Sequence, residues 1–229
     1  MIQIIMIMYL SIILAGVIIP FASILKINKK HKYISQKTLI LLEIIFLIVF
    51  IVFAKIFQVI LDKDYESLVK IFKDNIKYII NFIISGYTFI GGYLGSVLAV
   101  WVMLKNFNIN KRICFWLINN LNLMYAILKL ACFINGCCYG FTIIPIQLLE
   151  CIITCLIYVI INCAYIKKID TNNCIALSIM LFSIERFIIS FYRAYMTDLA
   201  FLGTELICIL LIIIGINISL RKVDVKWKN

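Results

Sequence analysis

Apolar residues run along this chain in long segments that are separated by short polar ones. Seven such segments cover about residues 4–25, 39–61, 79–104, 113–133, 145–166, 174–194 and 200–219. Each is of the length, roughly 18 residues or more, that lets a helix cross a hydrocarbon core about 30 Å thick. The pattern predicts an all-α integral membrane protein with seven transmembrane helices.

The composition supports a membrane protein without a separate soluble part. The chain is 65% hydrophobic and 14% charged, with a mean hydropathy of +1.10, whereas a soluble domain is about 45–50% apolar and about 25% charged. No polar stretch is long enough for a soluble domain, so residues 1–229 are expected to form a single polytopic membrane domain. The first apolar segment has no basic region before it and no small-residue cleavage site, which indicates a retained helix and not a secretory signal.

Positive charges gather in alternate loops. Fourteen basic residues lie in one set of loops and in the tail: Lys26, Lys29, Lys30, Lys32, Lys37, Lys105, Lys111, Arg112, Lys167, Lys168, Arg221, Lys222, Lys226 and Lys228. The loop between the second and third spans has four lysines, offset by four acidic residues. The positive-inside rule therefore predicts an N-terminus outside and a C-terminus in the cytoplasm. The net charge of +11 is explained by this orientation and needs no nucleic acid.

A second group of ionisable residues lies within the predicted spans, where each costs about 2.5–3.5 kcal/mol or more. They are Lys55, Lys129, Arg186, Arg193, Glu43, Glu150, Glu185 and Glu205. In the predicted orientation all except Glu43 lie toward the outside. Arg186 and Arg193 are two helical turns apart and can face one cavity. Two interpretations stay open: interfacial snorkelling and helix–helix ion pairs, or an anion site for a lipid phosphate.

The glycine-rich segment "SGYTFIGGYLGS" (residues 85–96) opens the third predicted span. Gly91 and Gly95 have the i, i+4 spacing of a small-residue surface on which helices approach closely. Glycines can also admit a bulky ligand. Helix packing and a ligand-binding role are both compatible with this pattern.

The segment "FINGCCYGFTIIPIQLLE" (residues 133–150) contains the turn between the fourth and fifth spans. Gly136 and Gly140 are expected to end the fourth helix, and Pro145 suits the start of the fifth. Gln147 and Glu150 are three residues apart and share a helix face. A purely structural turn accounts for the glycines and the proline, but less well for the Gln–Glu pair. The border of a site within the membrane is the other interpretation of this turn.

The nine cysteines form neither a disulfide framework nor a metal-ligand spacing, so no metal is expected. Most are interpreted as small hydrophobic residues. A disulfide between the neighbours Cys137 and Cys138 would close a strained eight-membered ring, so packing or free thiols are preferred. A role for an outward-facing thiol in acyl or glyceryl exchange is a further hypothesis.

Four motifs, "GYTFIGGYLG", "LKLACFINGCCYG", "PIQLLE" and "ERFIISFYR", resemble those of the prolipoprotein diacylglyceryl transferases in order and spacing. The resemblance covers roughly residues 85–215 and, more weakly, the first span around Tyr9 and Gly16. It implies a seven-helix enzyme of the bacterial plasma membrane. Such an enzyme moves a diacylglyceryl group from phosphatidylglycerol to the cysteine thiol of a lipobox peptide in a preprolipoprotein, without a cofactor.

The resemblance also implies which residues form the site. Catalytic roles would fall to Arg186, Lys129 and Glu150. Substrate-binding roles would fall to Tyr9, Gly91, Gly92, Asn135, Gly136, Tyr139, Gly140, Gln147, Arg193 and Glu205.

The chain departs from the family pattern at several sensitive positions. Ile90 and Ile144 stand where the family has histidines, and Ser190 stands where it has a glutamate. Lys129 replaces an arginine, which keeps the charge but loses the bidentate geometry of a guanidinium. Cys132 replaces an asparagine.

These departures leave the activation of the incoming thiol open. The only histidine, His31, lies in the predicted cytoplasmic loop. Glu150 or Glu205 could accept the thiol proton, or Lys129 and Arg186 could stabilise the thiolate. An alternative function is a catalytically degenerate member of the family that binds lipid or lipopeptide without transfer. An unrelated small transporter would show inverted repeats, and the sequence has none that we recognise.

Overall fold

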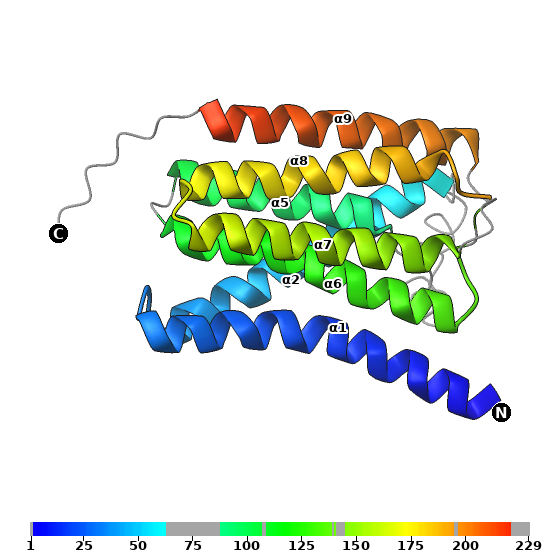
Figure 1. The fold of residues 1–229 in the computed structure, drawn as a ribbon, viewed down its shortest axis with the longest axis horizontal. Helices are drawn as coiled ribbons and strands as arrows, with labels where there is room; N and C mark the ends of the chain where they lie inside the picture. The colour runs from blue at the N-terminus through cyan, green and yellow to red at the C-terminus, as the bar shows by residue number, and fades with distance from the viewer. Residues whose placement is uncertain are drawn as a thin grey trace, which may run out of the picture.

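The chain folds into a bundle of long helices that run roughly along one axis (Figure 1). The computed structural model describes residues 2–62, 88–106, 109–138, 140, 145–194 and 197–220. The helices in these ranges are α1 (Ile2–His31), α2 (Gln36–Asp62), α5 (Phe89–Asn106), α6 (Lys111–Ile134), α7 (Ile146–Ile166), α8 (Thr171–Ser190) and α9 (Asp198–Leu220).

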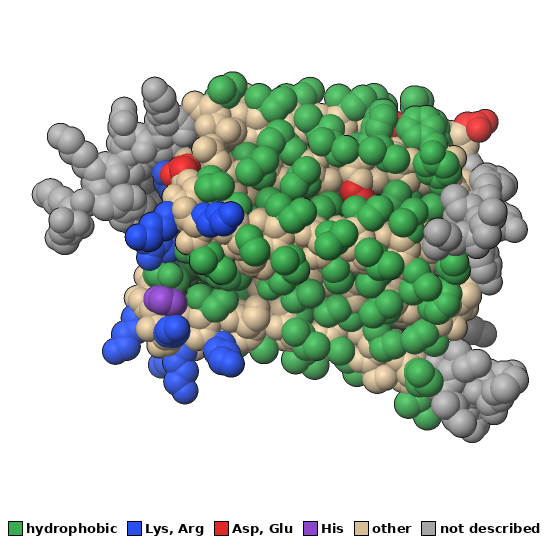
Figure 2. Space-filling view, viewed as in Figure 1, with side chains coloured by type: hydrophobic (Ala, Val, Ile, Leu, Met, Phe, Trp, Pro, Cys, Tyr) green, Lys and Arg blue, Asp and Glu red, His purple; other side chains and the backbone are tan. Residues whose placement is uncertain are grey.

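Six of the described helices are long and apolar enough to cross a membrane, and α5 is a shorter apolar helix. Isoleucine and leucine side chains are exposed along α1, α2, α7 and α9, and apolar side chains cover most of the face seen in Figure 2. Such a surface is stable against lipid tails and not against water. The chain is a multi-pass membrane protein.

The observed helices agree with the predicted spans within a few residues at most ends. The turn after α6 and the start of α7 at Ile146 fall where the glycines and Pro145 predict them. The first nine residues of the predicted third span (79–87) lie outside the described residues. The same holds for the basic tail and for the charged residues of the loop before the third span, apart from Asp62 at the end of α2.

The basic turns predicted to face one side of the membrane lie at one end of the bundle. The turns α1–α2, α5–α6 and α7–α8 all lie at the left end in Figure 1, and the α6–α7 and α8–α9 turns lie at the right. On the visible face, Lys and Arg side chains gather at the left end (Figure 2). The turns that are rich in Lys and Arg in the sequence thus lie together at one end of the molecule.

Small residues let α5 pack closely against α2. A Cβ atom at Gly91 would lie 2.4 Å from Cβ of Phe57, and one at Gly95 would lie 2.4 Å from Cγ of Phe53. Real Cβ atoms do not approach other atoms so closely, so glycine is required at both positions for this packing. Of the two interpretations of this glycine pattern, helix packing agrees with these contacts.

Buried amides connect α6 to its neighbours. Asn120 donates to the carbonyl oxygen of Pro20 at 2.8 Å and to Ser23 Oγ at 2.8 Å, both on α1. Asn122 donates to Ser178 Oγ on α8 at 2.9 Å. Hydrogen bonds of this kind between helices stabilise membrane bundles by roughly 0.6–2 kcal/mol each. They fix α6, which carries much of the site described below, between α1 and α8.

Candidate active site

Three cationic side chains surround one carboxylate in the interior of the bundle. Glu150 Oε1 accepts from Arg186 Nη1 at 2.6 Å and from Arg193 Nη2 at 2.6 Å. Glu150 Oε2 pairs with Lys129 Nζ at 2.6 Å. The Glu150 side chain has no exposed surface, and those of Lys129 and Arg186 are 7% and 6% exposed. The cluster therefore keeps an excess of two positive charges in a buried place.

The four charged residues come from three different helices and one turn. Lys129 lies in the last turns of α6, Glu150 in the second turn of α7, and Arg186 near the end of α8. Arg193 follows α8 and forms an isolated β-bridge with Gly140. A Cβ atom at Gly140 would lie 2.5 Å from the carbonyl oxygen of Tyr192, so the close approach of these two segments requires glycine there. This contact holds Arg193 near the start of α7, where Glu150 lies.

A tyrosine completes the hydrogen bonding of the cluster. Tyr125 Oη accepts from Arg186 Nη1 at 2.5 Å and donates to Glu150 Oε1 at 2.9 Å. Its ring packs against Phe89 and Phe182, with centroids 4.7 and 5.1 Å apart. The ring also lies under Lys129 Nζ and Arg186, at 5.0 and 5.5 Å. Tyr125 thus fixes both cations from the side of the hydrophobic core.

The cations border a cavity of about 320 Å³. Its lining includes Tyr9 from α1, Thr88 and Phe89 at the start of α5, and Lys129, Arg186 and Arg193 from the charged cluster. Most of the remaining lining is apolar. Arg193 Nε is buried and has no hydrogen-bond partner among the described residues. A cavity with cations at one wall and apolar side chains elsewhere suits an amphipathic molecule that bears a negative charge.

The turn after α6 closes one side of this region. The Asn135 N–H donates to the carbonyl oxygen of Ala131, and Gly136 adopts a φ of 64°. This left-handed conformation is one that glycine adopts without strain. Gln147 Nε2 donates to the carbonyl oxygen of Cys137 at 2.5 Å. Asn135, Gly136 and Gln147 therefore shape the turn, and none of them is among the residues that line the cavity.

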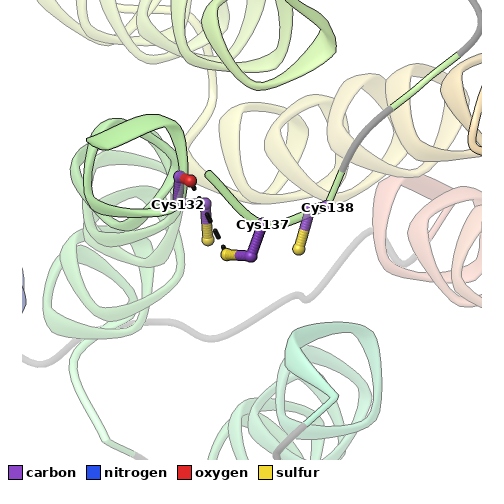
Figure 3. Close-up of side chains that lie close together, drawn as sticks. All are labelled: Cys132, Cys137 and Cys138. Atoms are coloured by element: carbon purple, nitrogen blue, oxygen red, sulfur yellow. Dashed lines mark hydrogen bonds between the residues drawn. The ribbon is translucent and has the colours of Figure 1, made fainter. Parts of the chain in front are cut away.

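Three cysteine side chains converge at this turn (Figure 3). The sulfur atoms of Cys132, Cys137 and Cys138 all lie within 4.8 Å of one another, and Cys132 and Cys138 line the cavity. A hydrogen bond with Cys132, helped by the charges of Lys129 and Arg193, lowers the pKa of the Cys138 thiol below its ordinary value, although burial opposes this. The sequence spacing indicated no ligand group, but the fold brings three thiols together.

The other predicted site residues occupy varied places. Gly91 packs against α2, and a Cβ atom at Gly92 would lie 2.7 Å from Cε2 of Phe50, so these two glycines serve helix packing. Glu205 is buried on α9 and accepts a hydrogen bond from Ser190 Oγ. Tyr139 lies outside the described residues.

Both interpretations of the intramembrane charges contribute to the structure. Lys129 and Arg186 form helix–helix ion pairs through Glu150, as the structural interpretation expects. They also line one cavity, as the anion-site interpretation expects. Arg193 is turned inward to the same carboxylate, and so it does not snorkel to an interface.

Sequence reasoning missed Tyr125 and Cys132 as site residues. Tyr125 stands in a continuous apolar stretch of α6, one turn before Lys129, and that i, i+4 relation was the signal that could have linked them. Cys132 lies three residues after Lys129 and was noted only as a departure from a family motif. The i, i+3 spacing puts it on the same face of the helix.

The fold and the site define a multi-pass membrane protein with a buried cationic cavity between its helices. Comparison with protein families gives a match over residues 2–221 to the prolipoprotein diacylglyceryl transferase family. The chain belongs to this family, whose members are transferases of lipoprotein biosynthesis. Comparison with curated proteins gave no match.

Proposed function

We propose that this protein transfers a diacylglyceryl group from phosphatidylglycerol to the cysteine thiol of a lipobox peptide. The single observation that carries the proposal is the shared position of Lys129, Arg186 and Arg193 at one wall of the cavity, around Glu150. Charged residues from three of the four family motifs thus meet in one place. The proposal includes seven transmembrane helices in a bacterial plasma membrane, with the N-terminus outside.

The geometry suits the departure of a phosphate. In the transfer, the substrate sulfur bonds to a glyceryl carbon while the bond from that carbon to a phosphate oxygen breaks. Glycerol phosphate leaves with the negative charge that develops on this oxygen. Buried cations fixed before the reaction stabilise such a charge more than water does, because they need not reorganise. Arg186 and Arg193 supply planar donors, and Lys129 supplies a point charge.

Glu150 and Tyr125 hold the cations in place for this task. Three like charges within one region repel one another, and the single carboxylate at 2.6 Å from each makes their proximity stable. It leaves two positive charges uncompensated, which a phosphodiester and its departing phosphate can use. We assign Glu150 and Tyr125 a positioning role.

One hydrogen bond concerns the position at which the family has a glutamate and this chain does not. Ser190 stands where the family has a glutamate, and its hydroxyl donates to Glu205 on α9. A carboxylate from another helix therefore lies beside the position from which one is missing. This favours an active transferase over the alternative of a family member that binds lipid or lipopeptide without transfer.

The test is a transfer assay with purified protein in phosphatidylglycerol vesicles. A lipobox peptide is added, and its mass is measured. We expect the diacylglyceryl mass increment with the wild type and none with Arg186→Ala. Arg112→Ala is the matched control, because Arg112 lies at the other end of the bundle at the start of α6. Lipid binding without any mass increment in the wild type would select the binding protein instead.

A further inference from the structure

The lining of the cavity raises the question of how a thiol becomes nucleophilic there. Among the described lining residues there is no Asp, Glu or His. The nearby carboxylate of Glu150 already accepts three hydrogen bonds and pairs with Lys129. A general base that is held by three cations is a weak proton acceptor. The cavity offers another way to activate a substrate thiol, through the cysteine side chains in its lining.

Three thiols beside the cavity have the geometry of a metal site. Their sulfur atoms lie within 4.8 Å of one another, and Zn–S bonds of about 2.3 Å place the sulfurs of a zinc site about 3.8 Å apart. Small side-chain rotations close this difference. A set of three sulfur ligands selects thiophilic ions over magnesium and calcium.

The backbone holds the three thiols in place before any ion is present. Cys137 N–H donates to the carbonyl oxygen of Cys132 at 3.0 Å, and its Sγ donates to the same oxygen at 3.6 Å. Gln147 fixes the Cys137 carbonyl from α7. Cys138 has a φ of 63°, a conformation that costs a non-glycine residue about 1 kcal/mol or more. The turn is thus held in a strained form that keeps the Cys138 sulfur beside the other two.

The surroundings of the thiols compensate the charge of such a site. Three thiolates and one divalent zinc ion carry a net charge of −1, and the neighbouring cluster has an excess of two positive charges. Lys129 lies on α6 one turn before Cys132. An anionic metal–thiolate group inside a membrane protein is costly unless cations lie near it. Here the cations are already in place.

We propose that Cys132, Cys137 and Cys138 bind one zinc ion whose fourth position is open to the cavity and takes the thiol of the incoming peptide. Two of the three ligands line the cavity, so a substrate sulfur entering it meets the ion directly. Three protein ligands and one open position are the arrangement of catalytic zinc sites, whereas structural sites have four. The inference rests on the proposed transferase function.

The step balances without an oxidant or reductant. The peptide thiol binds zinc and loses its proton to water, because a thiol that coordinates zinc is deprotonated. The zinc-bound sulfur then bonds to the glyceryl carbon, and the electron pair of the breaking carbon–oxygen bond leaves on the phosphate. The thioether product is a weaker ligand than a thiolate and departs from the ion. Zinc stays divalent throughout.

The first measurement is zinc binding by the reduced full-length protein in competition with a chromophoric chelator. We expect one zinc per chain, and at least about tenfold weaker binding for Cys132→Ser, Cys137→Ser and Cys138→Ser. Cys155→Ser and Cys163→Ser, on α7, are the matched controls and should bind as the wild type does. Thermal unfolding of each variant confirms that it is folded. Absence of stoichiometric binding, a disulfide within the cluster of the freshly purified protein, or equal binding by all variants would overturn the proposal.

The second measurement tests the open position. Cobalt replaces zinc, and the lipobox peptide is added while the thiolate-to-cobalt absorption is recorded. The cysteine peptide should change the spectrum and its serine analogue should not; an unchanged spectrum with both peptides overturns the proposal. Transfer by a metal-free triple Cys→Ser variant would disprove the zinc proposal and leave the proposed transferase function standing. If zinc binds with the expected spectral change but no transfer occurs, only the proposed transferase function is disproved.

Discussion

At the scale of single residues, the protein depends on one carboxylate that three cations share. Glu150 lies without exposed surface between Lys129, Arg186 and Arg193. Removing one partner from a buried ionic group is costly, because the remaining charges are left uncompensated. Tyr125 also contacts Lys129 and Arg186, but Glu150 is the only described carboxylate that forms an ion pair with all three cations.

Replacing Glu150→Gln tests this dependence. We expect a loss of about 3–5 kcal/mol in the free energy of unfolding, since three buried cations would lose their shared counter-charge. Thermal and denaturant unfolding in detergent measure it. Asp198→Asn, at the start of α9, is the control and should change stability little. An unchanged stability of Glu150→Gln would contradict the shared-carboxylate account.

Tyr125→Phe separates the hydroxyl from the ring. The ring contacts with Phe89 and Phe182 remain, while the hydrogen bonds to Arg186 and Glu150 are lost. A hydrogen bond to a charged group contributes about 1.5–3 kcal/mol. We expect transfer to fall at least about tenfold, with lipid affinity less affected, because the hydroxyl positions Arg186 for the departing phosphate. A variant as active as the wild type would show that the hydroxyl has no positioning role.

At the scale of elements, close packing of α5 on α2 places the start of α5 at the cavity. Gly95 touches Phe53 across this contact, and Thr88 donates to the carbonyl oxygen of Ala54 at 3.0 Å. The residues at the start of α5, with Phe50 and Ala54 of α2, line one side of the cavity. The glycines of the third predicted span therefore act on the site through the position of their helix.

A double substitution measures this packing. Gly95→Ala would bring a Cβ atom to 2.4 Å from Phe53 Cγ, and overpacking of this kind costs about 1–3 kcal/mol. Combining it with Phe53→Ala removes the ring atoms from the clash and leaves only the Cβ atom of residue 53, 2.6 Å away. The two changes should therefore cost less together than the sum of their separate effects. Unfolding of the four proteins of this cycle gives the coupling. Strict additivity would show that the contact between α2 and α5 is not tight.

The sequence predicted elements better than it predicted contacts. The hydropathy pattern located the helices, because each must bury its backbone hydrogen bonds within lipid, and Gly136 and Pro145 marked the turn between α6 and α7. The three-thiol cluster could not be predicted, since it depends on the positive φ angles of Gly136 and Cys138. The role of Tyr125 was hidden because a tyrosine in an apolar helix has the same pattern as any core residue.

At the scale of the whole molecule, the concentration of Lys and Arg in alternate turns is the basis of the proposed orientation. The described basic turns lie at one end of the bundle and the charged cluster lies toward the other, beside the α6–α7 and α8–α9 turns. The positive-inside rule predicts that the basic end faces the cytoplasm. In this proposed orientation the cavity lies in the outer half of the membrane, on the side where secreted peptides emerge.

Single cysteines in an otherwise cysteine-free background test this orientation. A cysteine introduced by Lys30→Cys, at the end of α1, should be protected from a membrane-impermeant maleimide added to intact cells. One introduced by Thr197→Cys, just before α9, should be labelled. Both should react after the cells are permeabilised. The reverse pattern would place the cavity on the cytoplasmic side and contradict the proposed topology.

The central claim is that Lys129, Arg186 and Arg193 together bind the phosphate of a phospholipid. Its most direct test is native mass spectrometry of the purified protein with phosphatidylglycerol and with uncharged diacylglycerol. We expect phosphatidylglycerol to stay bound to the wild type and to Arg112→Ala, and to bind Arg186→Ala no better than the uncharged lipid does. Equal retention of phosphatidylglycerol by the wild type and Arg186→Ala would contradict the claim.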